Sequence, residues 1–347
     1  MTAFNLQWQT MLTDYITAIA WSPNLSSLAA ASAAGDVLFW PDCKDSTPIA
    51  LLSSQERTIE GLAFSYDGQF LAAAGQAGTV YLWRTQDVTQ PALTLDASGQ
   101  WIEQLAWSPT ANLFAFSVGK AVQVWDLDRG VKVATLAFDR SSVLDLHWHP
   151  KGEYLAIAGY RGARIWAVNN WQQEAPALEI ASATLALRWS PDGQYLAAGN
   201  FDRTITVLPW GERDPWLMRG FPGKVRKLAW SIPAMAGEAP VLASVSAEGV
   251  VLWEREAEGG WAGDVVDLHE GTVLDLAFHP HWPMLASAGQ DGVVRLWTPL
   301  DGAIAPLAGA AQGLTHLAWQ PTGDRLAAGG QAGELLVWAI NDALLDS

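Results

Sequence analysis

Histidine and cysteine are the residues of this chain that could bind a metal ion, and the sequence has six histidines and one cysteine. His147 and His149 are separated by one residue, and so are His279 and His281. Alternate residues of a β-strand point to the same face, so each pair could present two imidazoles to one ion. The two pairs belong to distant copies of a repeat, however, and His149 and His279 stand before Pro where other copies have Ser. We therefore expect turn capping, and no metal or other cofactor.

Motifs for nucleophilic or phosphate chemistry are not evident. The sequence has no Gly-rich phosphate loop, no HExxH, no GxSxG and no convincing Ser/His/Asp arrangement. The lone cysteine, Cys43, excludes an internal disulfide and any zinc site built from several cysteines. The sequence accordingly predicts no catalytic residues.

Charge narrows the classes of partner. The chain has 347 residues, 20 Lys and Arg against 36 Asp and Glu, and a formal net charge of −16. Binding to nucleic acid or to anionic lipid needs concentrated cations, so we expect neither. Apolar runs are too short to cross a bilayer, and residues 1–8 do not resemble a signal peptide. A cytoplasmic protein is expected, and a monomer when it is alone.

One pattern returns eight times along the chain: an apolar residue, two variable residues, Leu or Ile, a small residue, an aromatic residue, Ser or His, and usually Pro. The copies begin at Ile16, Ile59, Ile102, Val143, Leu185, Val225, Val273 and Leu314. Each copy continues with an Ala-rich apolar run, a short turn, and a third run that ends at Trp40, Trp83, Trp125, Trp166, Leu208, Trp253, Trp297 or Trp338. The fifth copy is shortened and alone lacks the tryptophan, so we expect it to be the most irregular.

A period of 41 to 45 residues with several short β-type runs is typical of a four-stranded propeller blade. Small sheets with two apolar faces must stack on neighbours, and the series must close. The predicted fold is all-β, a single eight-bladed β-propeller of four-stranded antiparallel blades that forms one domain, residues 1–347. Too few residues follow Trp338 for an outer strand, so an N-terminal strand at about 4–8 should complete the last blade and close the ring.

The repeats resemble those of the WD-repeat β-propellers over nearly the whole chain. The seventh copy is the nearest match, because His269, Ser287, Asp291 and Trp297 stand at positions that are characteristic of that repeat. The resemblance implies that these four residues form a buried hydrogen-bond chain that ties three strands together. The other seven copies lack the histidine, and 13 of the 20 tryptophans fall at repeat positions. We expect stability to depend mainly on aromatic packing.

The resemblance implies a non-catalytic scaffold or adaptor that docks partner proteins or peptides on the rims of the propeller. The alternative is an enzyme or ligand-binding propeller that uses the axial channel, because a fold does not fix a function. A cavity at the mouth of the channel, lined by converging titratable groups, would favour that alternative.

Two surfaces are candidates for docking. In the WD-repeat topology, one rim would gather cations and aromatic residues of copies three to six, which suits an acidic or aromatic-anchored segment: Trp101, Lys120, Arg140, Tyr160, Arg161, Phe201, Arg203, Phe221, Lys224 and Arg226. The opposite rim would present four tryptophans from loops outside the repeat positions: Trp171, Trp210, Trp261 and Trp282. The alternative for each set is packing against its own blades, and the sequence leaves the choice open.

Overall fold

The computed structural model describes residues 4–24, 26–54, 57–235, 237–246, 249–257, 259–266, 269–298, 302–303 and 306–340. Every regular element in these ranges is a β-strand, and the strands pair antiparallel. Within the same ranges, no helix is long and apolar enough to cross a membrane. The expected all-β class is therefore confirmed. The chain forms two compact units, and each is described by itself.

Unit 1 consists of Met1–Gly99 and Leu268–Ser347 and holds copies one, two, seven and eight. The first copy forms a four-stranded sheet of β2 (Ile16–Trp21), β3 (Leu28–Ser32), β4 (Val37–Trp40) and β5 (Ile49–Leu52). The second forms another of β6 (Ile59–Phe64), β7 (Phe70–Gly75), β8 (Thr79–Arg84) and β9 (Leu93–Asp96). The seventh contains β24 (Val273–Phe278), β25 (Leu285–Gly289) and β26 (Val293–Thr298), and two short strands pair with β26, namely β27 (Gly302–Ala303) and β28 (Leu307–Ala308).

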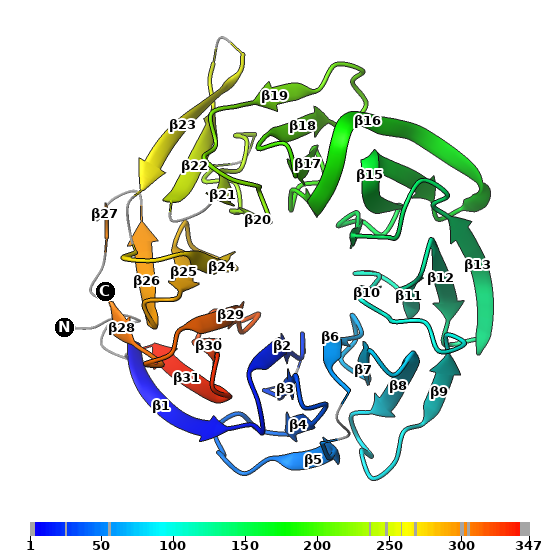
Figure 1. Cartoon of the computed structure of the whole chain (residues 1–347), viewed down its shortest axis with the longest axis vertical. Helices are drawn as coiled ribbons and strands as arrows, with labels where there is room; N and C mark the ends of the chain where they lie inside the picture. Colours follow the sequence, from blue (N-terminus) through cyan, green and yellow to red (C-terminus); the bar gives the residue numbers. More distant parts are fainter. Residues whose placement is uncertain are drawn as a thin grey trace. The chain divides into compact units, whose positions relative to one another are not determined.

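The eighth copy confirms the expected role of the N-terminal segment. Its strands are β29 (Leu314–Trp319), β30 (Arg325–Gly330) and β31 (Glu334–Ile340), and the fourth strand of the sheet is β1 (Phe4–Met11). Figure 1 shows β1 in blue beside β31 in red, and Phe4 pairs with Ile340 and Met11 with Glu334. The first strand of the chain therefore covers an edge that β31 would otherwise expose.

Unit 2, Gln100–Asp267, holds copies three to six. The third copy forms a four-stranded sheet of β10 (Leu105–Trp107), β11 (Leu113–Val118), β12 (Ala121–Asp126) and β13 (Val131–Ala137). The sixth forms another of β20 (Lys227–Trp230), β21 (Leu242–Ser246), β22 (Gly249–Arg255) and β23 (Trp261–Val266).

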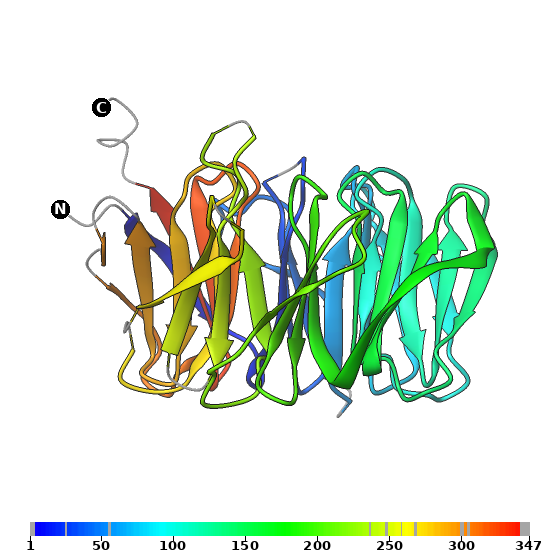
Figure 2. The same cartoon turned by 90° about the horizontal axis from the view of Figure 1, so that it is seen from above.

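Copies four and five do not form two separate sheets. They share one six-stranded sheet of β14 (Asp145–Trp148), β15 (Tyr154–Ala167), β16 (Asn170–Trp189), β17 (Tyr195–Asn200), β18 (Ile205–Pro209) and β19 (Trp216–Met218). The 20-residue β16, a long green ribbon in Figure 2, pairs with β15 through its first part and with β17 through its last. Residues 177–187 contain neither Gly nor Pro, so no turn residue separates the outer strand of copy four from the opening strand of copy five. The described residues thus form seven sheets rather than eight separate ones.

Successive sheets within each unit are joined through tryptophans of the opening strands. The indole of Trp21 donates to the carbonyl of Ala318 at 3.0 Å, and that of Trp319 donates to Ala277 at 3.1 Å. In unit 2, Trp148 donates to Ala106 at 3.2 Å and Trp230 to Arg188 at 3.0 Å. Each such bond satisfies a buried polar group while the ring adds apolar area to the core. Repeat tryptophans are therefore structural, as their spacing predicts.

Candidate partner-binding surface

The hydrogen-bond chain expected in the seventh copy is present around His269. Its Nδ1 lies 3.0 Å from both carboxylate oxygens of Asp291, and its Nε2 lies 2.8 Å from Oγ of Ser287. Burial opposes ionisation of Asp291, but the bonds and charge of His269 outweigh it and lower the pKa of this carboxyl group. Trp297 is half-buried on β26, and the bonds recorded among the described residues do not extend to its indole. Through these bonds, the segment that leads into β24 is held against β25 and against the turn before β26.

His149 and His279 have equivalent structural roles. The Nε2 atom of His149 lies 3.3 Å from the carbonyl of Gly193, and that of His279 lies 3.1 Å from the carbonyl of Gly323. Each Nδ1 accepts a backbone N–H from the turn that follows, which is the expected capping. Burial lowers the pKa of both imidazoles. Within the part of the chain that the structure describes, no group of three or more His, Cys, Asp or Glu side chains is arranged to hold a metal ion.

A titratable cluster joins the opening strands of copies four and five. Oδ2 of Asp145 accepts the backbone N–H of Leu187 at 2.7 Å and Nη1 of Arg188 at 2.8 Å. Nδ1 of His147 accepts the N–H of Trp189 at 3.3 Å, and burial together with the charge of Arg188 lowers the pKa of His147 to about 3. Both polar side chains thus hold β14 against β16, and the imidazole is neutral at neutral pH. These contacts account for the cluster without a substrate.

The expected cation and aromatic residues of copy four gather beside the turn at Tyr160 and Arg161. Tyr160 is 52% exposed, and Arg161 is also exposed. Arg140 binds both carboxylate oxygens of Glu179 at 2.9 Å, and its hydrogen bond lowers the pKa of Glu179. Arg140 is therefore engaged within the molecule, whereas Tyr160 and Arg161 remain accessible.

A second cluster forms at the equivalent turn of copy five. The ammonium of Lys224 lies 4.0 Å from the ring centroid of Phe201, a cation–π contact, and Phe201 is still 50% exposed. Arg203 follows two residues later in the same turn and is exposed. A flat aromatic face beside two positive charges can receive an aromatic or carboxylate group from a partner.

Arg161 and Arg203 hold a backbone conformation that the same repeat position gives to glycine elsewhere. Five residues before the closing tryptophan of a copy, Gly35, Gly78, Gly292 and Gly333 have positive φ of 90°, 69°, 74° and 95°. Arg161 and Arg203 stand at this position with φ of 70° and 66°. A left-handed conformation costs a side-chain-bearing residue about 1 kcal/mol. Backbone strain of this kind often collects at functional sites, which makes both arginines candidates for a binding role.

Four other residues of the predicted rim are placed as follows. Trp101 is 59% exposed before β10, Lys120 is exposed between β11 and β12, and Arg226 is exposed before β20. Phe221 is not an exposed anchor, because it is 7% exposed and packs on Trp253 with ring centroids 5.6 Å apart. Phe221 lies four residues before the opening pattern at Val225, the same position that His269 has before Val273 in copy seven.

The opposite-rim tryptophans largely cover their own sheets. Trp171 begins the outer part of β16 and packs edge-on against Trp148, and Trp261 begins β23 and contacts Trp230. Trp210, in the turn after β18, packs on Tyr154 and Trp189. Trp282 stacks on His279 at 4.5 Å but stays 39% exposed. Two of the four thus lie in strands rather than loops, and the packing explains three of them.

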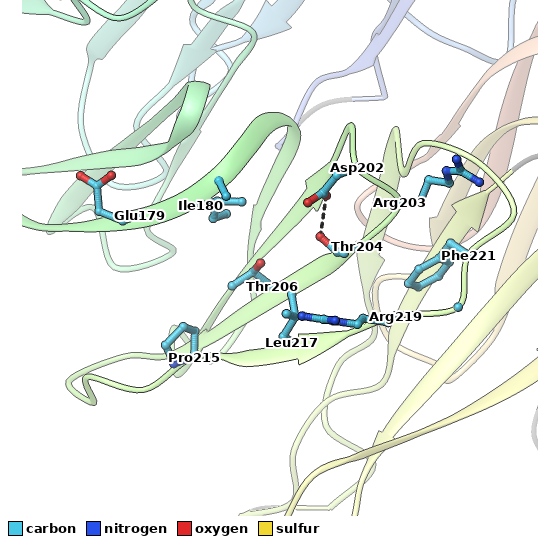
Figure 3. Close-up of a pocket in the computed structure, with 12 residues that line it drawn as sticks. Glu179, Ile180, Asp202, Arg203, Thr204, Thr206, Pro215, Leu217, Arg219 and Phe221 are labelled. Carbon is cyan, nitrogen blue, oxygen red and sulfur yellow. Dashed lines mark hydrogen bonds between the residues drawn. The ribbon is translucent and has the colours of Figure 1, made fainter.

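The exposed clusters of unit 2 border a cavity of about 680 Å³ between β16, β18 and β19 (Figure 3). Its lining includes Glu179, Asp202, Arg203, Leu217 and Arg219. Glu179 comes from the copy-four cluster and Arg203 from the copy-five cluster, so the cavity connects the two. The sequence places Leu217 in an outer strand, but the role of Leu217 and Arg219 in a cavity depends on the fold of two adjacent copies, and no local pattern marks it.

Two family models match this chain. The model for the WD domain, G-beta repeat, matches residues 46–84 and 264–298. The model named Eukaryotic translation initiation factor eIF2A matches residues 72–200. No curated protein matches the chain. The matched segments and the four-stranded antiparallel sheets are consistent with WD repeats of the β-propeller type.

Proposed function

We propose that this protein is a non-catalytic scaffold that docks partner proteins or peptides on the exposed surface of copies three to six. We further propose that its eight copies act as the blades of one closed ring, completed by β1. The partner would carry an acidic or aromatic-anchored segment. The observation that carries the proposal is the pair of strained arginines, Arg161 and Arg203, each beside an exposed aromatic side chain.

The proposed contacts fall into two classes that should respond differently to mutation. Rim charges steer the encounter, so they set the association rate and its dependence on salt. Aromatic anchors that are desolvated in the complex stabilise the bound state, so they set the rate at which the partner dissociates. Arg161 and Arg203 belong to the first class, and Tyr160 and Phe201 to the second.

The test begins with affinity pull-down on the intact protein, followed by binding kinetics of the recovered partner. We expect Arg161→Glu with Arg203→Glu to slow association and to flatten its salt dependence. Tyr160→Ala and Phe201→Ala should speed dissociation, at a cost of about 1 to 4 kcal/mol each. If these variants bind as the parent does while Trp282→Ala loses affinity, the partner uses the opposite rim and the proposal fails.

A role in translation is a second candidate, supported by the match of residues 72–200 to the Eukaryotic translation initiation factor eIF2A model. The net charge of −16 favours contact with a protein component over contact with RNA. Co-sedimentation with ribosomes that survives nuclease treatment would support this role, and its absence would leave the general scaffold as the better account.

The alternative function, an enzyme or a ligand-binding propeller, would require a site in the axial channel. The cavity in Figure 3 lies between β16, β18 and β19, and Asp145, His147 and Arg188 are committed to hydrogen bonds within the protein. Both observations support a binding role. We also propose that the protein is cytoplasmic and monomeric when alone. Cys43 is buried, and burial raises the pKa of its thiol, which suits a structural residue that takes no part in redox chemistry.

A further inference from the structure

A groove follows the short outer strand β19 of copy five. The cavity of about 680 Å³ shares Glu179 and Pro215 with a second cavity of about 740 Å³, which extends to Tyr154 and Trp210. It shares Arg219, Gly220 and Phe221 with a third, of about 320 Å³, which extends to Val265. Because neighbouring cavities share lining residues, they adjoin one another in a row that passes β19, and we refer to this row as the groove.

The strand beside this groove has an unpaired edge and an apolar surface. β19 pairs with β18, where Thr206 is opposite Leu217, and it is the last strand of the six-stranded sheet. The free edge of a strand presents backbone donors and acceptors to any extended chain that approaches it. Met218 is buried and anchors the strand, whereas Leu217 is 49% exposed toward solvent. The groove therefore offers main-chain pairing together with apolar contact.

The charge of the groove is positive at the end formed by Arg203 and Arg219. Neither guanidinium has a hydrogen bond or ion pair within the described part of the chain. Of the nearby acids, Glu179 binds Arg140, whereas Asp202 accepts a hydrogen bond from the neutral Thr204 hydroxyl at 2.8 Å, so two arginines face one carboxylate that no described cation binds. In Figure 3, the Arg219 side chain lies beside Leu217, between β18 and β19. At the other end, Glu212 offsets the charge of Arg213, so the excess is local.

We propose that the groove along β19 binds an extended polypeptide segment of a partner, with an acidic residue at Arg203 and Arg219 and an apolar side chain over Leu217. Carboxylates form short charge-assisted bonds with arginine, and an extended segment places alternate side chains on the same side. Arg203 also belongs to the rim surface proposed above, but Leu217 and Arg219 do not. The groove can therefore be tested separately from the rim.

The test uses two fluorescein-labelled peptides of alternating sequence, one of Leu and Glu and one of Leu and Lys, and measures anisotropy with the intact protein. The parent should bind the Glu peptide and not the Lys peptide. Arg219→Glu and Leu217→Asp should each weaken binding of the Glu peptide about tenfold or more, as expected for anchor residues. Matched changes on other outer strands, Lys132→Glu on β13 and Leu93→Asp on β9, should leave its affinity within about twofold.

Two further readouts keep the proposal falsifiable if a variant is unstable. Arg219→Glu should gain affinity for the Lys peptide, which loss of folding could not produce. Bound Glu peptide should slow backbone hydrogen exchange at residues 213–221 of the parent. The proposal is overturned if the parent fails to bind the Glu peptide, if Lys132→Glu weakens binding as much as Arg219→Glu, or if protection appears at Tyr160 and Phe201 without protection of β19.

Discussion

Unit 1 and unit 2 are built from the same repeat but differ in charge. Unit 1 contains five of the 20 Lys and Arg residues and 17 of the 36 acids, whereas unit 2 contains the other 15 cations and 19 acids. Their formal charges are therefore −12 and −4, although the units are similar in length. In unit 2 the added cations include Arg161 and Arg203, at positions where unit 1 has glycine.

One outer strand from each unit gives a second contrast. In unit 1, β1 is eight residues long, and Trp8 donates to the carbonyl of Cys43 and stacks on Trp40. In unit 2, β19 has three residues and is bordered by cavities. Contacts of β1 in unit 1 thus hold the fold together, whereas we propose that the strained, charged surface beside β19 in unit 2 serves a partner.

The largest effect should follow removal of β1. Deleting residues 1–11 exposes the edge of β31 and removes buried Phe4 and Trp8, so the free energy of unfolding should fall by about 5 kcal/mol or more. Urea unfolding of the truncated and full chains measures the change, with Leu217→Asp on β19 as the control that should leave stability nearly unchanged. Equal unfolding midpoints for the truncated and full chains would show that β1 is a dispensable tail.

The aspartate position of copies seven and five provides a smaller comparison. Asp291→Ala leaves the buried ring of His269 without its carboxylate partner and should cost about 2 to 3 kcal/mol. Asp202→Ala, at the same position of copy five, removes an exposed side chain and should cost no more than about 0.5 kcal/mol. Thermal unfolding compares the two variants, and similar losses would mean that unit 1 has no special structural network here.

Acid should weaken the fold through His147, whose equivalent in copy seven is Ala277. The pKa of His147 is about 3 in the folded state and about 6.5 in the unfolded state. Below pH 6.5 the unfolded chain therefore binds a proton that the folded chain does not, and the free energy of unfolding falls progressively as the pH approaches 3. Between pH 7 and pH 5 the loss should be about 2 kcal/mol. His147→Ala should reduce this pH dependence of urea unfolding, and an unchanged dependence would place the titration elsewhere.

The smallest effect concerns the strained arginines. Arg161→Gly and Arg203→Gly should each raise the free energy of unfolding by up to about 1 kcal/mol, because glycine adopts positive φ without strain. Gly78→Ala should lower it by a similar amount. Thermal melting measures all three. If the arginine variants are less stable than the parent, the side chains contribute to folding. The proposal that these arginines lower stability but serve binding would then be incorrect.

Most of the fold was predictable because its signals are local and repeated. The opening pattern and the closing tryptophan located the strands, and the short remainder after Trp338 indicated that β1 completes the last sheet. The merger of copies four and five was not predicted, because the repeat indicates where strands begin but not whether a chain without turn residues will bend between them.

The candidate site was predictable only in outline. Residue type and repeat position correctly placed Tyr160 and Phe201 on the surface. The burial of Phe221, the engagement of Arg140 by Glu179 and the groove at Leu217 depend on contacts between adjacent copies, which no single repeat encodes.

The most direct test of the division between the units is a hydrogen-exchange footprint of the intact protein with a partner recovered by pull-down. The account predicts slower exchange in unit 2, at residues 158–163 and 199–204, with the exchange of copies one, two, seven and eight unchanged. The protection should disappear in the double variant Arg161→Glu and Arg203→Glu, measured at a salt concentration where the parent remains bound. Protection confined to unit 1, or protection of unit 2 that survives both charge reversals, would contradict the account.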